Sequence, residues 1–163
     1  MRSILGASKN TVRLELSHSR TVVICYGNPL RGDDGFGWQV AQCLIEARLK
    51  NLDVITCHQL TPELAEVISQ SRVVVFVDAS LGVHAGKITV RELEPNLSSK
   101  NFTHHLEPAQ VLAFSHSVYG RAPRAWLITV GALNLEHSEH LSPQVAAAIP
   151  KVLEEVQRVL QLP

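Results

Sequence analysis

The chain of 163 residues has the length of one ordinary domain, and 45% of its residues are hydrophobic, as in a typical globular protein. Lys and Arg together number 15, as do Asp and Glu, so the formal net charge of +0 excludes a general basic surface for nucleic acid or an anionic membrane. Charged residues make up 18%, too few for a disordered polyelectrolyte. No apolar run approaches the length of about 18 residues that spans a bilayer.

The first 20 residues are expected to form a short extension ahead of a single domain that covers residues 21–163. The extension lacks the continuous apolar core of a secretory signal. Its basic and hydroxyl residues are typical of a transit peptide, but Glu15 and the lack of a clear amphipathic stripe argue against one.

The chain has three cysteines, Cys25, Cys43 and Cys57, each within or beside an apolar segment. An odd number without CxxC spacing does not predict a disulfide framework or a structural zinc site. Small unpaired core residues in a reducing compartment are the simpler interpretation. We therefore expect a cytoplasmic protein with free thiols.

The predicted elements begin with a strand at 21–26, an unbroken apolar run that is typical of a central strand covered on both faces. A stripe of apolar residues at helical spacing then predicts a helix from about residue 35 to 50. A second strand follows at 53–57. The pair Thr61-Pro62 predicts the start of another helix, with Thr61 as its N-cap and Pro62 at the first helical position.

A third apolar strand is predicted at 73–77, and Asp78 follows it directly. The alternating run at 87–93 predicts a fourth strand, at an edge of the sheet. A short helix at 107–114 and a fifth strand at 125–130 come next.

The last helix is predicted to begin at Ser142-Pro143. Pro150 falls inside its apolar pattern and is expected to kink or split the helix, because the proline ring cannot donate the backbone hydrogen bond. The alternation of strands and helices predicts a three-layer α/β domain, with helices flanking a mostly parallel sheet of about five strands.

Ligand sites of open α/β sheets lie beyond the carboxyl ends of the strands. Three polar features are expected there: the loop 27–37 after the first strand, Asp78 after the third, and the pair His104-His105 ahead of the short helix. One histidine and two carboxylates can bind a divalent transition metal while leaving positions open for substrate.

The loop 27–37 carries the adjacent residues Asp33 and Asp34. It lacks the dinucleotide spacing and the Walker lysine, and two aspartates would repel a phosphate. Because adjacent side chains rarely converge on one target, we expect one aspartate to face the site and the other to stabilise the start of the helix. Asp78 lies at the mouth of a buried strand, where a carboxylate needs either a partner or a chemical task. Its structural alternative is to accept N–H bonds in the next turn.

Covalent catalysis is not favoured by the nucleophiles present. Cys57 and His58 are sequence neighbours at a strand, so their side chains point to opposite faces. Ser80 has no G-x-S-x-G elbow around it.

Residues 22–35, which end in YGNPLRGDDG, closely resemble the N-terminal signature of the nickel–iron hydrogenase maturation endopeptidase family. Residues 75–79 resemble its second motif, an apolar strand closed by Asp-Ala, and residues 104–112 fit the third, a histidine ahead of a helix. The resemblance covers about residues 20–160. Residues 58–64 resemble the branch that serves soluble bidirectional hydrogenases.

The resemblance implies a phosphorylase/hydrolase-like fold and an endopeptidase that removes the C-terminal extension of the nickel-loaded precursor of a hydrogenase large subunit. Carried over residue by residue, it makes Asp34, Asp78 and His104 the metal-contacting and catalytic trio. His105 replaces His104 if the loop register differs. Asp33 is a candidate general base or a structural anchor behind the site. The precursor would supply the nickel, so no tightly bound metal is expected in the purified protein.

Two other functions stay open. A non-catalytic metal-site chaperone or binding module could use the same scaffold, and an α/β enzyme acting on a small ligand such as a nucleoside is a third possibility. The lack of phosphate-binding chemistry in the loop that carries Asp33 and Asp34 argues against the third. Cleavage of a nickel-loaded precursor would separate the first two.

Overall fold

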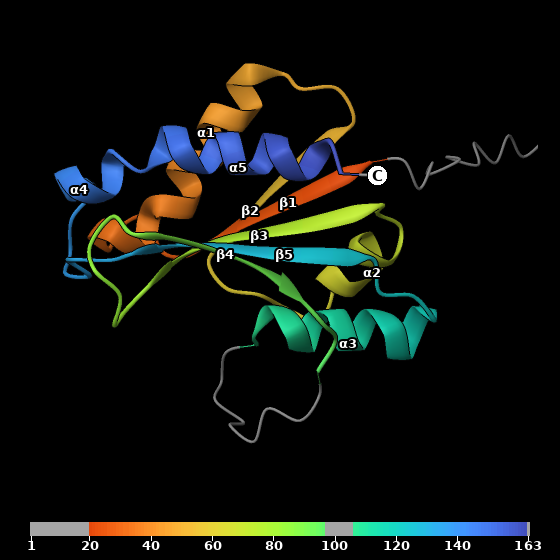
Figure 1. Cartoon of the computed structure of the whole chain (residues 1–163). Helices are drawn as coiled ribbons and strands as arrows, with labels where there is room; N and C mark the ends of the chain where they lie inside the picture. The colour runs from red at the N-terminus through yellow and green to blue at the C-terminus, as the bar shows by residue number, and fades with distance from the viewer. Residues whose placement is uncertain (1–19, 97–105, 163) are drawn as a thin grey trace, which may run out of the picture.

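The computed structural model describes residues 20–96 and 106–162. Five strands form one sheet in the order β2-β1-β3-β5-β4 (Figure 1). The strands are β1 (Thr21–Tyr26), β2 (Leu52–Cys57), β3 (Val73–Ser80), β4 (Ile88–Leu93) and β5 (Arg124–Gly131). All neighbours pair in parallel except β4, which runs antiparallel to β5 at one edge. The predicted mostly parallel sheet and its edge strand are confirmed.

Helices cover both faces of this sheet, as the three-layer prediction requires (Figure 1). One face carries α1 (Phe36–Ala47), α4 (Pro143–Ala146) and α5 (Ile149–Leu160), and the other carries α2 (Leu64–Ser69) and α3 (Pro108–Tyr119). A short 3-10 helix, η1 (Gly32–Gly35), leads directly into α1. The predicted extension, apart from Arg20, lies outside the described residues.

The central strands are buried on both faces, which explains their unbroken apolar sequence. Val73, Val75 and Val77 of β3 belong to the core beneath α1 and α5. Val74 and Phe76 point the other way and pack in the core beneath α2 and α3. Because both layers close on the sheet, polar groups can collect only at its ends.

The start of α2 differs from the prediction. The helix begins at Leu64, and Thr61 does not cap it, because residues 61–63 form a preceding turn. In this turn the N–H of Leu64 donates to the carbonyl of Thr61 at 3.2 Å, and the N–H of Ala65 donates to that of Pro62 at 3.0 Å. This three-residue spacing is the 3-10 pattern that often precedes an α-helix.

The other helices follow the predicted order. α3 is longer than predicted and ends at Tyr119, where Gly120 adopts the left-handed conformation with φ 72°. Pro150 lies in the first turn of α5, where its missing N–H is not needed, so the predicted interruption appears as the break between α4 and α5. Of the helices described, none is long and apolar enough to cross a membrane.

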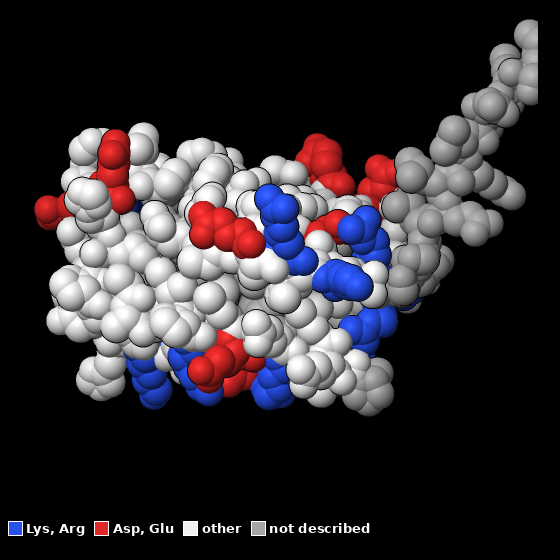
Figure 2. All heavy atoms as spheres, turned by 90° about the horizontal axis from the view of Figure 1, so that it is seen from above, with Lys and Arg blue, Asp and Glu red and all other residues white. Residues whose placement is uncertain are grey.

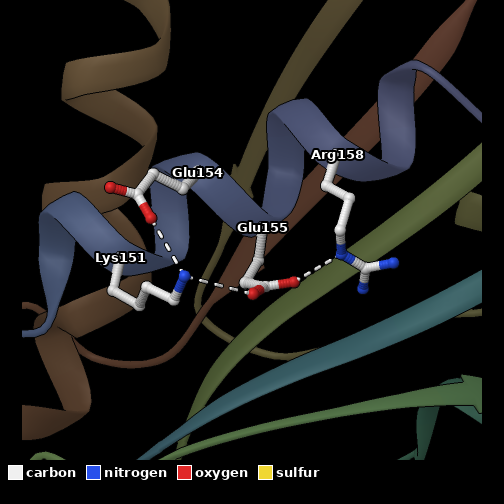
Figure 3. Close-up of polar contacts among 4 residues, drawn as sticks. All are labelled: Lys151, Glu154, Glu155 and Arg158. Atoms are coloured by element: carbon white, nitrogen blue, oxygen red, sulfur yellow. Dashed lines mark hydrogen bonds and ion pairs between the residues drawn. The ribbon is translucent and has the colours of Figure 1, made fainter.

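The outer surface above α1 and α5 carries interspersed charges of both signs (Figure 2). On α5, Lys151 pairs with Glu154 at 3.0 Å and with Glu155 at 3.6 Å, and Arg158 pairs with Glu155 at 2.7 Å (Figure 3). Pairs one helical turn apart on an exposed face contribute only about 0.3–0.5 kcal/mol each. These ion pairs therefore add little to the stability of the fold.

Candidate functional site

A pocket of about 380 Å³ lies at the carboxyl ends of β1, β2 and β3. Its walls come from the end of β1 and the loop that follows, from residues 58–60 after β2, from Asp78 on β3, and from Leu106 ahead of α3. This is the edge at which the sequence predicts a site. The pocket brings Asp34 and Asp78, two members of the predicted trio, into one cavity.

The loop after β1 is packed tightly over the end of that strand. Gly27 has a φ of +129°, and a Cβ there would stand 2.0 Å from the carbonyl oxygen of Asp34. The indole N–H of Trp38 in α1 donates to the carbonyl of Gly27 at 2.8 Å. A Cβ on Gly37 would lie 2.9 Å from the carbonyl oxygen of Tyr26, so α1 begins in direct contact with the sheet. These contacts allow glycine alone at the turn that presents Asp34.

Asp34 is a pocket-lining residue in η1. Its Oδ2 atom accepts a hydrogen bond from the backbone N–H of Asn28 at 2.9 Å. Asn28 also accepts a bond on its own side-chain oxygen from the N–H of Leu30 at 3.0 Å, which holds the loop in a compact turn. The Asp34 carboxylate is thus joined to the loop that forms the pocket wall.

Asp78 lies near the end of β3, opposite Thr129 of β5. Burial raises the pKa of Asp78 to about 7, and the negative charge of Asp34 acts in the same direction. Hydrogen bonds from the Ala79 N–H, at 2.8 Å to Oδ1, and from the Tyr26 hydroxyl lower the pKa but do not offset the burial. A carboxyl group in this state readily takes up a proton or a cation near neutral pH.

Asp33 is fully buried, with 0% of its surface exposed, and it points away from the pocket. Its Oδ2 atom accepts the N–H groups of Leu133 and Asn134, both at 2.8 Å. The N–H of Ser142 donates to Oδ1 at 2.6 Å, and the Ser142 hydroxyl donates to Oδ2 at 2.9 Å. Burial raises the pKa of Asp33, but these hydrogen bonds outweigh it and hold the pKa below its ordinary value. This geometry favours a structural anchor over a general base.

Three further pocket residues extend the predicted set. His58 lines the pocket and makes an edge contact with Trp38, with ring centroids 5.5 Å apart. Tyr26 and Arg31 were not predicted as site residues. The register that pairs Cys25 with Val77 sets Tyr26 beside Asp78. The sequence did contain a signal for Tyr26 as a pocket residue: it is the last residue of the strand that leads into the loop 27–37.

None of the three cysteines lines the pocket. Cys25 is buried, Cys43 and Cys57 are partly buried, and all three are free. Burial raises the pKa of both the Cys25 and the Cys57 thiols, which disfavours the reactive thiolate. Covalent catalysis stays disfavoured, as the sequence predicts.

The third predicted ligand falls outside the described part of the chain. His104 and His105 immediately precede Leu106, which lines the pocket. Within residues 20–96 and 106–162, no group of three or more His, Cys, Asp or Glu side chains is placed to hold a metal ion. The choice of His104 over His105 stays a prediction.

The architecture and the pocket define a three-layer α/β protein with a carboxylate pair at the carboxyl edge of its sheet. The same fold occurs in solved hydrogenase maturation endopeptidases. The [NiFe] hydrogenase maturation protease HycI from Thermococcus kodakarensis is 25% identical, with a TM-score of 0.71, over 88% of this chain and 94% of that chain. A hydrogenase 2 maturation peptidase from a Thaumarchaeota archaeon is 26% identical, with a TM-score of 0.66, over 88% and 99%.

The hydrogenase maturating endopeptidase HybD from Escherichia coli shares the fold at a TM-score of 0.72 and 23% identity, over 87% of this chain and 92% of that chain. No protein-family model and no curated protein sequence matches the chain. The resemblance to the nickel–iron hydrogenase maturation endopeptidases, inferred from the motifs, is confirmed by the solved structures.

Proposed function

We propose that this chain is an endopeptidase that removes the C-terminal extension of the precursor of a nickel–iron hydrogenase large subunit. Its likeness to two maturation proteases at 25% and 26% identity extends over 88% of the chain. The observation that carries the proposal is the pocket that Asp34 and Asp78 share, because it sets two carboxylates at the carboxyl edge of this fold. A peptide bond is hydrolysed when such groups activate water and manage its proton.

Nickel enters this proposal as part of the substrate, already held by the precursor. Asp34, Asp78 and His104 would be the residues that contact it, with His105 as the alternative to His104. Carboxylate and imidazole groups are ligands that suit nickel. Leu106 in the pocket wall supports this assignment, because the two histidines directly precede it in the chain. Bound nickel would supply Lewis-acid polarisation of the scissile carbonyl.

The chain's own groups would handle the protons. While it is not bound to nickel, Asp78, with a pKa of about 7, can accept a proton from the attacking water and return it to the leaving amine near neutral pH. This assigns to Asp78 the acid–base role that an aspartyl protease gives to a carboxyl group. Asp33 has no such role in the proposal, because four hydrogen bonds from Leu133, Asn134 and Ser142 already occupy its oxygens.

The hydrogenase large-subunit precursor is the proposed partner, and we place the protein in the cytoplasm. The three free cysteines support this compartment, because thiols persist in its reducing conditions. One sheet with a core on each face supports the proposal of a single domain over residues 21–163.

The test mixes the purified protein with nickel-loaded and with nickel-free precursor and follows the mass of the large subunit. We expect the precursor to lose its C-terminal extension only when it is loaded. The Asp78→Asn protein serves as the inactive control. If the parent protein binds loaded precursor stably without any loss of mass, the chain is a binding module and the peptidase proposal is wrong.

A further inference from the structure

The segment 131–142, which begins at the last residue of β5, is hydrogen-bonded to the turn that carries the two aspartates. The four hydrogen bonds accepted by Asp33 all come from this segment, with Ser142 109 residues away along the chain. Three of the donors are backbone N–H groups and the fourth is the Ser142 hydroxyl. A carboxylate can accept all four bonds, whereas an amide would set its NH₂ group against an N–H donor.

Backbone hydrogen bonds also connect the turn to the segment 131–142, and each of the two supplies donors to the other. The N–H of Asp33 donates to the carbonyl of Asn134 at 2.8 Å, and that of Gly32 donates to Ser138 at 2.7 Å. Ser138 donates back to the carbonyl of Leu30 at 3.0 Å. Gly32 has a φ of +51°, and a Cβ on it would lie 2.7 Å from the carbonyl oxygen of Asn134. The turn and the segment therefore meet at van der Waals distance along several residues.

Asp33 and Asp34 are consecutive residues of η1. A 3-10 helix has about three residues per turn, so neighbouring side chains diverge by about 120°. The side chain of Asp33 can thus point toward the segment 131–142 while that of Asp34 points into the pocket. Since one short turn carries both, any displacement of Asp33 is passed on to Asp34.

The segment itself has no direct contact with the cavity. The lining residues come from 26–34, 58–60, 78 and 106, and none comes from 131–142. An effect of the segment on the pocket can pass through the turn, or through the lining residue Arg31, whose Nε donates to the carbonyl of Leu135 at 3.2 Å. The bond from the Asn28 N–H to the Asp34 carboxylate, at 2.9 Å, lies on the pocket side of that turn and reports its position.

We propose that Asp33 is a positioning residue: its buried carboxylate locks the segment 131–142 to the 3-10 turn and thereby fixes Asp34 in the pocket. Ser142 is the part of this lock that can be changed with least disturbance. Its hydroxyl bonds Asp33 and makes no side-chain cap for α4. The structural half of the proposal is independent of the peptidase activity, and the catalytic half rests on the proposed function.

Ser142→Ala tests the lock, and Ser138→Ala is its matched control in the same segment. The Ser138 hydroxyl bonds only locally in this structure, to the backbone of His140 at 3.1 and 3.2 Å, among the described residues. Amide hydrogen exchange at Asn28 is measured by NMR in the parent and both variants, and kcat and KM for processing are measured in parallel.

For Ser142→Ala we expect exchange at Asn28 to be about threefold faster or more and kcat to fall by about threefold to tenfold with KM unchanged, since one hydrogen bond to a charged group is lost. Ser138→Ala is expected to stay within about twofold of the parent in both readouts. Asp33→Glu keeps the charge but has a longer side chain. If this variant folds, it is also expected to exchange Asn28 faster and to have a lower kcat.

A folded Ser142→Ala protein that exchanges Asn28 at the parent rate would overturn the lock. Faster exchange with an unchanged kcat would overturn its role in positioning Asp34 for catalysis. If the parent protein fails to process any precursor, the proposed function is wrong, and the exchange rates alone still decide whether Asp33 positions Asp34.

Discussion

Two carboxylates at the same edge of the sheet lie in opposite environments. Asp33 has no exposed surface, yet four hydrogen bonds keep its pKa below the ordinary value. Asp78 is partly exposed, yet burial raises its pKa to about 7, since the bonds from Ala79 and Tyr26 do not offset it. The charge of Asp34 adds to this rise.

The difference teaches that the exposed surface of a carboxylate does not by itself decide its pKa. Burial and the donors around the group act together, because a fully bonded carboxylate is stable as an anion, whereas a buried one with fewer donors gains from a proton or a cation. Asp33 therefore stabilises the fold, and Asp78 is available for chemistry. The following experiments test each side of this comparison.

The largest expected effect is on processing. Asp34→Asn and Asp78→Asn are each expected to lower precursor cleavage by about 100-fold or more, because each removes a charged group from the proposed site. Cleavage is followed by mass, and folding by circular dichroism. Asp53→Asn is the control, since Asp53 is a partly exposed carboxylate on β2, outside the pocket, that pairs with Arg20 at 2.8 Å. A folded Asp34→Asn protein that cleaves at the parent rate would contradict the site.

The proposed histidine ligand gives a second large effect. His104→Ala is expected to abolish processing, by about 100-fold or more, because it removes the imidazole of the trio. His105→Ala is expected to be milder and is the matched control. The same mass assay measures both variants. If His105→Ala abolishes processing and His104→Ala does not, the predicted register of this loop is wrong.

The next effect is on stability. Asp33→Asn is expected to lower the free energy of unfolding by about 3 kcal/mol, because charge-assisted bonds are lost and an NH₂ group faces N–H donors. Urea unfolding near neutral pH measures it, with Asp34→Asn as the comparison. Because the folded pKa of Asp33 is below its unfolded value, its contribution is present above about pH 4 and is lost as the pH falls below that. The gap between parent and variant must therefore narrow in acid.

The smallest expected effect is a gain, rather than a loss, in the free energy of unfolding. The folded pKa of Asp78, about 7, lies above the ordinary value of 3.8, so ionisation of this group destabilises the fold increasingly as the pH rises from about 4 to 7. Asp78→Asn removes that penalty. We expect the stabilisation by Asp78→Asn to grow by about 2 kcal/mol over this range, after a discount for the water that still reaches the group. Thermal unfolding across pH measures it, and a pH-independent difference would contradict the comparison.

The sheet was largely predictable, because burial on both faces leaves an unbroken apolar run in strands such as β1 and β3. The alternating pattern of β4 likewise marks an edge. Helix ends were less predictable: Thr61 has the chemistry of an N-cap, but a 3-10 turn follows it and moves the start of α2 to Leu64. Local sequence does not decide between these two ways of satisfying the same N–H groups.

The placement of Asp34 and Asp78 in one pocket was predictable, because its signal is local. Asp34 and Asp78 each end a strand-and-loop motif, and the parallel sheet brings those ends together. The partners of Asp33 could not be predicted, because Leu133, Asn134 and Ser142 lie 100 or more residues away and no periodic pattern connects them to the turn. Long-range hydrogen bonds of this kind become visible only in the folded chain.

The position of β4 as an edge strand also affects the tendency of the protein to aggregate at high concentration. A border strand offers unpaired backbone groups to which a second molecule could add, the first step toward fibrils. Arg91 and Glu92 are exposed in the second half of β4 and would have to lose water in such a contact. We expect these two charges to disfavour self-association, so replacing both with valine is expected to make the protein precipitate at high concentration.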